Sequence, residues 1–328
     1  MESLKTPRLR HIPEDWIMWK FNAHAHSTES DGELTIEEID TIAKEWQMNG
    51  KRREVNGITG GIIGVTDHNT VKAHENFVSP NIVPGIEVKV RREDYGVDLL
   101  LYHTREKLLA FCHDVIYPKL NSNPKAAIMG PTRLALFELL DAATDAGCAI
   151  VIPHYYHVEG ISVLPKELQE NIAKKYAPIV EFNGRLRRWW NHKAWLFAHA
   201  TYHKPILLPR RKSLPVIATG DSHLRGHFTS SYTKIPLPLH IDPTGPNLFR
   251  AIRRYNRHCK RKLEDPSTAD TVATAYHIIK KGGMSVVSDY IKRWFTHTPK
   301  PIAPDDPTVQ QQLLERLQRE GEDDADDS

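Results

Sequence analysis

The chain has 328 residues, of which 40% are hydrophobic and 26% are charged, and its formal net charge is +3. This composition is typical of a globular protein and excludes a fibrous one, and no apolar run of about 18 residues predicts a transmembrane helix. The three cysteines lie far apart and the N-terminal segment lacks an apolar signal region, so a cytoplasmic location is expected. The chain contains eighteen histidines and only three cysteines, so any metal would be held by imidazole and carboxylate groups.

Between residues 19 and 223, short apolar runs alternate with amphipathic stretches, which indicates repeated strand and helix units. The expected strands are 20–26, 61–66, 81–90, 97–103, 149–154, 179–182 and 215–219. The expected helices are 36–47, which opens with a capping box of Thr35 and Glu38, 133–146, 164–176 and 189–203. About seven strands with intervening helices predict a closed or nearly closed β/α barrel, and an open doubly wound sheet is the alternative.

The last third of the chain differs in composition. Residues 234–247 are rich in proline and are expected to be irregular, whereas 248–263 and 271–295 are expected to be helical. Residues 250–262 hold seven Lys or Arg and no acidic residue, which predicts a basic helix face. Six acidic residues lie among 320–328, so residues 1–319 carry a formal charge of +9 and the end of the chain is expected to be disordered.

Histidine and carboxylate residues follow the expected strands, with one group at the end of each. In chain order these groups are His24-Ala-His26 with Asp31, Asp67-His68, Glu87, His103, His154, Glu181 with Arg185, and Asp221-Ser-His223. The carboxyl ends of parallel strands share one rim, so these side chains are expected to converge. Residues two apart on a strand face the same side, so His24 and His26 could bind one ion, and Glu87 could bridge two ions.

The order of these motifs resembles the polymerase and histidinol phosphatase (PHP) family of metal-dependent phosphoesterases, over residues 20 to about 225. The resemblance implies a distorted (β/α)7 barrel with a helical, basic C-terminal extension, and a site for two or three divalent ions of Mn, Zn or Fe. It implies three ligand sets: His24, His26, Glu87 and Asp221; Glu87, His103 and His154; and Asp31, His68 and His223. It divides the chain into a PHP domain (1–233), a basic extension (234–300) and an acidic tail (301–328).

The implied reaction is in-line attack on phosphorus by a hydroxide generated on the metals. Arg185 is interpreted as a phosphate clamp, because a guanidinium group can contact two phosphate oxygens at once. Asp67 is interpreted as a catalytic-site residue that orients His68, and Glu181 as a support for a ligand. Trp190 is interpreted as a core residue rather than a stacking surface.

Basic residues favour a nucleotide or nucleic-acid phosphodiester as the substrate and no membrane partner. They form the 250–262 face and two clusters expected near the rim, Arg185 with Arg187 and Arg188, and Arg210 with Arg211 and Lys212. A phosphomonoesterase resembling histidinol phosphatase is the first alternative. A C–N hydrolase of the amidohydrolase type is another, against which the Thr66–Asn69 motif and the Asp221-Ser-His223 ending argue. A non-catalytic PHP module would have lost ligands, and none is missing.

Overall fold

The structure is a computed structural model that describes residues 11–282 except 15, 47–53, 56–57, 93–94, 187, 201–212 and 244. The predicted acidic tail, the predicted helix beyond residue 282, Arg187 and the cluster at 210–212 lie outside the described residues. Of the helices within these ranges, none has the length and apolar character needed to cross a membrane.

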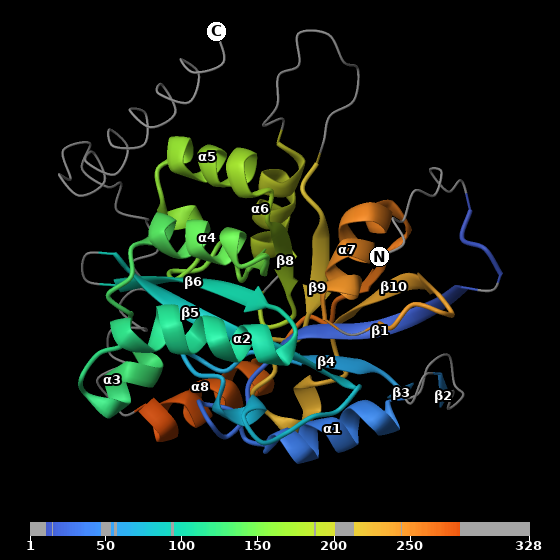
Figure 1. Cartoon of the computed structure of the whole chain (residues 1–328), viewed down its shortest axis with the longest axis horizontal. Coiled ribbons are helices and arrows are strands. Elements are labelled where there is room, and N and C mark those ends of the chain that lie inside the picture. Colours follow the sequence, from blue (N-terminus) through green and yellow to red (C-terminus); the bar gives the residue numbers. More distant parts are fainter. Residues whose placement is uncertain are drawn as a thin grey trace, which may run out of the picture.

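Seven strands form a barrel whose sheet is nearly closed (Figure 1). They are β1 (Trp16–Ala25), β4 (Ile62–Val65), β5 (Ile82–Arg92), β6 (Tyr95–Tyr102), β7 (Ala149–Ile152), β8 (Ile179–Asn183) and β9 (Val216–Thr219). The seam between β9 and β1 is bridged where the His26 N–H donates to the Ser222 carbonyl (2.9 Å) and the Ser222 N–H donates to the His24 carbonyl (3.1 Å). The prediction of a seven-stranded barrel is therefore confirmed.

The strands do not all run the same way. β1, β4 and β5 are mutually parallel, as are β7, β8 and β9, but β6 is antiparallel to both β5 and β7. Only residues 93 and 94 separate β5 from β6, and a parallel pair needs a crossover of about a dozen residues or more. The carboxyl end of β6 therefore lies at the opposite end of the barrel from those of its neighbours.

Helices cover the outside of the barrel. They are α1 (Ile36–Glu45), α2 (Arg105–Phe111), α3 (Pro124–Met129), α4 (Leu136–Asp145), α5 (Lys166–Tyr176), α6 (Arg188–His199), α7 (Pro246–Tyr255) and α8 (Thr268–Gly282). The predicted capping box begins α1, because the Thr35 N–H donates to Glu38 Oε2 (2.9 Å) and the Glu38 N–H donates to Thr35 Oγ1 (3.4 Å). Helices α4, α5 and α6 lie on one side of the barrel in Figure 1, and their apolar faces join one buried core with strands β5 to β9.

The segment after residue 231 belongs to the same sheet. β10 (Tyr232–Pro238) pairs antiparallel with β1, and β11 (Lys260–Lys262) pairs with β10. The prediction of irregular chain at 234–247 is thus wrong for 234–238, and the expected boundary at 233 falls inside a strand. The prolines argued against a strand, although Ile235 and Leu237 alternate with them and are buried. A separate two-stranded ladder joins β2 (Glu54–Val55) and β3 (Ile58–Thr59).

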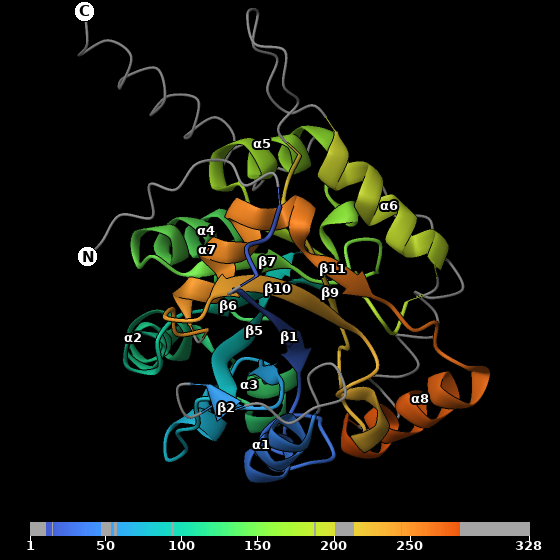
Figure 2. The ribbon, with the colours of Figure 1, turned by 90° about the vertical axis from the view of Figure 1, so that its right-hand side faces the viewer.

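Helix α7 closes one end of the barrel. Its residues Leu248, Phe249 and Ile252 belong to the same buried cluster as the barrel residues Phe21 and Leu100. The ring centroid of Phe249 lies 4.5 Å from that of Tyr102, the last residue of β6. Since β6 runs against its neighbours, α7 covers the end where the parallel strands begin, and Figure 2 shows it near the start of β1. The other end of the barrel carries the polar residues described below.

Candidate metal centre

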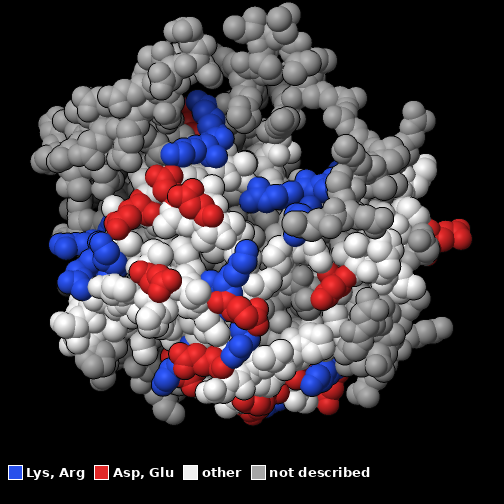
Figure 3. Space-filling view, viewed as in Figure 1, with Lys and Arg blue, Asp and Glu red and all other residues white. Residues whose placement is uncertain are grey.

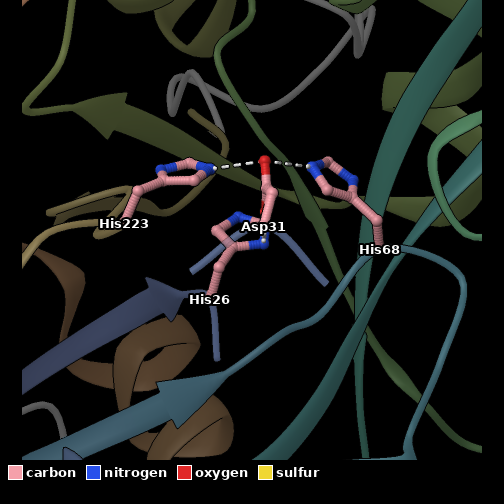
Figure 4. A group of neighbouring side chains, drawn as sticks. All are labelled: His26, Asp31, His68 and His223. Carbon is pink, nitrogen blue, oxygen red and sulfur yellow. Dashed lines mark hydrogen bonds and ion pairs between the residues drawn. The ribbon is translucent and has the colours of Figure 1, made fainter. Parts of the chain in front are cut away.

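Four buried side chains surround one point at the carboxyl ends of β1, β4 and β9 (Figure 4). Asp31 Oδ2 lies 3.1 Å from His223 Nε2 and 3.7 Å from His68 Nε2. His26 Nδ1 lies 3.3 Å from Asp31 Oδ1. Figure 4 shows the Asp31 carboxylate between the rings of His223 and His68. The structure thus brings together the three predicted ligands of the third set, with His26 added to them.

A second group adjoins the first through His26. His24 Nε2 lies 3.0 Å from His26 Nε2 and 3.2 Å from Glu87 Oε2. Asp221 Oδ1 lies 3.5 Å from the Nε2 atoms of both histidines. The register of β1 against β4 shifts between Asn22 and Ala25, and such an irregularity redirects side chains next to functional sites. All four predicted members of the first ligand set are therefore neighbours.

The third group contains a carboxylate that was not predicted. Glu87 Oε1 lies 3.1 Å from His154 Nε2, which lies 3.7 Å from Asp98 Oδ2. The other oxygen of Glu87 lies 3.3 Å from His26 Nε2 and 3.3 Å from His68 Nδ1. Glu87 therefore stands between adjoining groups, which is the position that a carboxylate bridging two ions would take.

His103 is not part of this centre, which corrects its predicted place as a ligand. It follows β6, so it lies at the end of the barrel closed by α7, where its Nδ1 accepts a hydrogen bond from the Thr104 N–H (2.6 Å). Asp98, five residues earlier on β6, lies beside His154 instead. The short turn before β6 and a lone charged residue between Val97 and Leu99 were the sequence signals that could have identified it.

The backbone is strained at two residues of the centre, His154 and Asp221, and at Asn69, which follows His68. Asn69, His154 and Asp221 have φ values of 52°, 28° and 45°. Residues other than glycine rarely adopt this left-handed region, although Asn, Asp and His do so more readily than most. Such strain persists only where surrounding contacts impose it, and it is concentrated at functional sites.

Glu181 supports the centre, in agreement with its predicted role. Its Oε1 lies 2.8 Å from His24 Nδ1 and also accepts a hydrogen bond from the Thr219 hydroxyl. Its Oε2 accepts hydrogen bonds from the His154 N–H (2.6 Å) and from Asn183 Nδ2 (3.0 Å). This buried carboxylate therefore fixes the ring orientation of His24 and the backbone that carries His154.

Asp67 acts on a different segment from the one predicted. Its carboxylate accepts hydrogen bonds from the Ser27 N–H (2.7 Å), the Ser27 hydroxyl (2.6 Å) and the Ser30 hydroxyl (2.6 Å). These bonds hold the loop between His26 and Asp31. The structure thus assigns Asp67 to the placement of Asp31, rather than to the orientation of His68.

Arg185 lies at the rim beside Asp221. Its Nη2 donates to Ser230 Oγ (3.3 Å), whereas its buried Nε and Nη1 have no hydrogen-bond partner among the described residues. Burial lowers the pKa of this guanidinium, and the charge of Asp221 opposes that effect. The Nε and Nη1 nitrogens therefore remain for an anionic ligand, and the phosphate clamp stays a prediction.

The protonation of the cluster follows from its charges. Burial lowers the pKa of His154 and of His223, but Glu87 and Asp31 respectively outweigh it, and both pKa values rise to about 9. Burial raises the pKa of Glu87 and of Asp31, but the neighbouring histidines hold both pKa values well below the usual range. His154 and His223 therefore hold protons near neutral pH, and a divalent cation that binds to the cluster would have to displace those protons.

The residues fit a divalent metal. Among the described residues, the buried Nδ1 atoms of His26, His68 and His154 and both carboxylate oxygens of Asp98 have no hydrogen-bond partner. Buried polar atoms without partners are costly and uncommon, and metal ligation would satisfy them. Imidazole and carboxylate donors without thiolate suit Zn²⁺, Mn²⁺ or Fe²⁺.

The predicted basic clusters fall in different places. The helix predicted over 248–263 ends at Tyr255, and residues 260–262 form β11 instead. Both segments carry their arginines at the closed end of the barrel, where Arg253 of α7 donates to the Ala177 carbonyl and Arg261 Nε of β11 donates to the Val216 carbonyl (2.9 Å). On the face of Figure 1, basic and acidic residues are interspersed (Figure 3). Trp190 is buried, as predicted for a core residue.

Helix α8 borders the rim, which the sequence did not predict. His277 Nε2 lies 2.8 Å from the backbone carbonyl oxygen of Asp31. Asp270, at the start of the same helix, is close enough to Arg185 and His227 for their charges to lower its pKa, after the larger effect of its hydrogen bonds with Ser267. In Figure 2, α8 lies on the opposite side of the barrel from α7.

No protein-family model and no curated protein sequence matches this chain. Its structure is similar to that of the lesion-specific endonuclease PfuEndoQ from Pyrococcus furiosus, with 15% identity and a TM-score of 0.49, over 73% of this chain and 56% of that protein. It is also similar to a two-domain protein from Bacteroides vulgatus whose description names a predicted PHP-like metal-dependent phosphoesterase, with 14% identity and a TM-score of 0.43, over 84% and 74% of the chains.

An amidohydrolase from Chromobacterium violaceum with bound sulfate is similar at 14% identity and a TM-score of 0.41, over 76% of this chain and 99% of that one. This chain spans little more than half the length of PfuEndoQ. At identities of 14–15% these likenesses concern the fold alone, and the chemistry rests on the residues of the centre.

Proposed function

We propose that this chain is a metal-dependent phosphoesterase of the type that its motifs resemble. One observation carries the proposal: eight of the nine predicted ligands, drawn from five segments of the chain, meet in one buried cluster. Asp98 takes the place beside His154 that was predicted for His103. These groups would hold two or three divalent ions.

Bound divalent ions lower the pKa of water and stabilise negative charge on phosphoryl oxygens. The protein supplies the remaining parts. Glu181 fixes His24, and Asp67 holds the loop that carries Asp31. The Nε and Nη1 groups of Arg185, which have no hydrogen-bond partner among the described residues, would bind the non-bridging oxygens of a phosphate beside Asp221.

We infer that the substrate is a nucleotide or nucleic-acid phosphodiester. The formal charge of +9 on residues 1–319 and the position of Arg185 support an anionic substrate. The α7 arginines give no support to this inference, because they lie at the closed end of the barrel. A phosphomonoester is the alternative that the following assay distinguishes.

The test is an assay of the purified full chain with Mn²⁺ on bis(p-nitrophenyl) phosphate, p-nitrophenyl phosphate and a 5′-phosphorylated oligonucleotide. We expect the diester or the oligonucleotide to be hydrolysed faster than the monoester. Glu87→Gln keeps the shape of the central carboxylate but removes its charge, so activity is expected to fall by about 100-fold or more. The control is Glu170→Gln, a half-buried residue of α5 that is paired with Lys174 and lies outside the cluster. Absence of hydrolysis of all three substrates, or full activity in Glu87→Gln, would contradict the proposal.

A further inference from the structure

A buried lysine, Lys89, lies beside Asp98 of the candidate centre. Lys89 follows Glu87 by two residues on β5 and is 8% exposed. Its Nζ lies 2.7 Å from Glu159 Oε1 and 4.0 Å from Asp98 Oδ1. Lysine is almost never buried to this extent unless its charge is paired, and none of the roles described above uses Lys89 or Glu159.

Asp98 faces this lysine with one oxygen and the centre with the other. Its Oδ2 lies on the side of His154 Nε2, at 3.7 Å, while its Oδ1 lies on the side of Lys89 Nζ. Neither oxygen accepts a hydrogen bond within the described part of the chain. Oδ1 therefore faces the ammonium group of Lys89, while Oδ2 faces the centre.

Glu159 completes the arrangement through both its side chain and its backbone. Its carboxylate pairs with Lys89, and its carbonyl accepts a hydrogen bond from the Asp98 N–H (2.9 Å). Glu159 lies in the loop that follows His154, so these two bonds join that loop to β5 and β6. They connect the three segments that carry Glu87, Asp98 and His154.

Charge balance gives Glu159 a second role. An ammonium group near Asp98 would repel a divalent cation bound by the same carboxylate. The charge of Glu159, in contact with the ammonium, offsets that repulsion. Lys89 can therefore hold Asp98 without preventing cation binding.

We propose that the Lys89–Glu159 ion pair positions Asp98 as a metal ligand, so that both are positioning residues of the group formed by Glu87, Asp98 and His154. This proposal rests on the proposed function to the extent that a divalent ion binds there. Removal of residues that orient a ligand typically lowers metal affinity about 10- to 100-fold. Removal of Lys89 or Glu159 is expected to lower the affinity for one bound ion by a similar factor and to leave the affinity for the other ions unchanged.

The experiment measures Mn²⁺ bound per chain by equilibrium dialysis and elemental analysis over a range of free Mn²⁺. Lys89→Met removes the charge and keeps the length of the side chain, and it should weaken one bound equivalent about 10- to 100-fold while the others are retained. Asp98→Asn should weaken the same equivalent, and the double variant should lose no more than Asp98→Asn alone. Lys89→Arg should restore binding. The control is Lys119→Met, which removes an exposed lysine paired with Glu138.

Unchanged binding in Lys89→Met would overturn the proposal, as would a gain of one equivalent, which would mean that the ammonium excludes an ion. If circular dichroism shows that Lys89→Met is unfolded, Glu159→Gln decides, and it must weaken the same equivalent. The readout does not depend on hydrolysis. Wild-type protein that binds Mn²⁺ but cleaves no phosphoester would contradict only the proposed function.

Discussion

At the scale of single residues, the ligands of the centre are held in place by polar groups from other segments, as Glu181 holds His24 and Asp67 holds the loop before Asp31. His24, His26, Asp31 and His68 are recognisable because strand ends and ligand chemistry are both readable from the sequence. The roles of Asp67 and Asp98 depend on which atoms lie across the barrel. The neighbours of Asp67 come from a different segment of the chain, so no local pattern identifies its role, whereas Asp98 is indicated only indirectly, by the short connection before β6.

His227 gives a prediction for stability against pH. This histidine is buried beside Arg185 and the centre, and its Nδ1 has no hydrogen-bond partner among the described residues. Burial, followed by the charges of Arg185 and His223, lowers its pKa to about 3. The unfolded chain binds a proton near pH 6.5, whereas the folded chain does not, so the contribution of His227 to stability falls as the pH drops from about 6.5 toward 3.

His227→Gln should remove this dependence. Between pH 7 and pH 5, the metal-free variant should gain about 2 kcal/mol of stability relative to the metal-free wild type. Urea unfolding of both proteins in the presence of a chelator measures this difference. A difference in unfolding free energy that does not change with pH would show that His227 does not titrate in the way described.

At the scale of elements, the direction of one strand determines which residue joins the centre. The positions of the strands were predictable from their apolar runs, and all seven are present. The expectation that β6 runs parallel to its neighbours, with His103 at the shared rim, is wrong, because a strand has the same apolar pattern in either direction. Only two residues separate β5 from β6, and a connection of that length can join only antiparallel strands. The length of this connection therefore indicates the direction of β6.

This orientation predicts different outcomes for two histidines. His154→Asn should lower Mn²⁺ affinity by about 10-fold or more, because His154 lies at the centre and Asn tolerates its positive φ. His103→Asn should bind Mn²⁺ as the wild type does, because His103 lies at the closed end of the barrel. Equilibrium dialysis of the two variants makes the comparison. Loss of an ion in His103→Asn would show that β6 contributes its carboxyl end to the centre.

At the scale of the whole molecule, the barrel has one apolar end and one polar end. Helix α7 fills the first with Phe249 and Ile252, and the candidate centre occupies the second. The alternation of strands and helices favoured a barrel but left an open doubly wound sheet as the alternative. The sequence could not show that α7 lies at the far end, because its arginines indicate a solvent-exposed face without indicating where that face lies.

The central claim is that hydrolysis of phosphoesters by this chain depends on divalent ions held in this centre. The most direct measurement determines metal content and phosphodiester hydrolysis on the same sample as purified, after removal of metal by a chelator, and after return of Mn²⁺. We expect more than one bound ion per chain, loss of hydrolysis with the ions, and recovery of both together. Hydrolysis that persists in the metal-free chain, or a chain that takes up no ions, would contradict it.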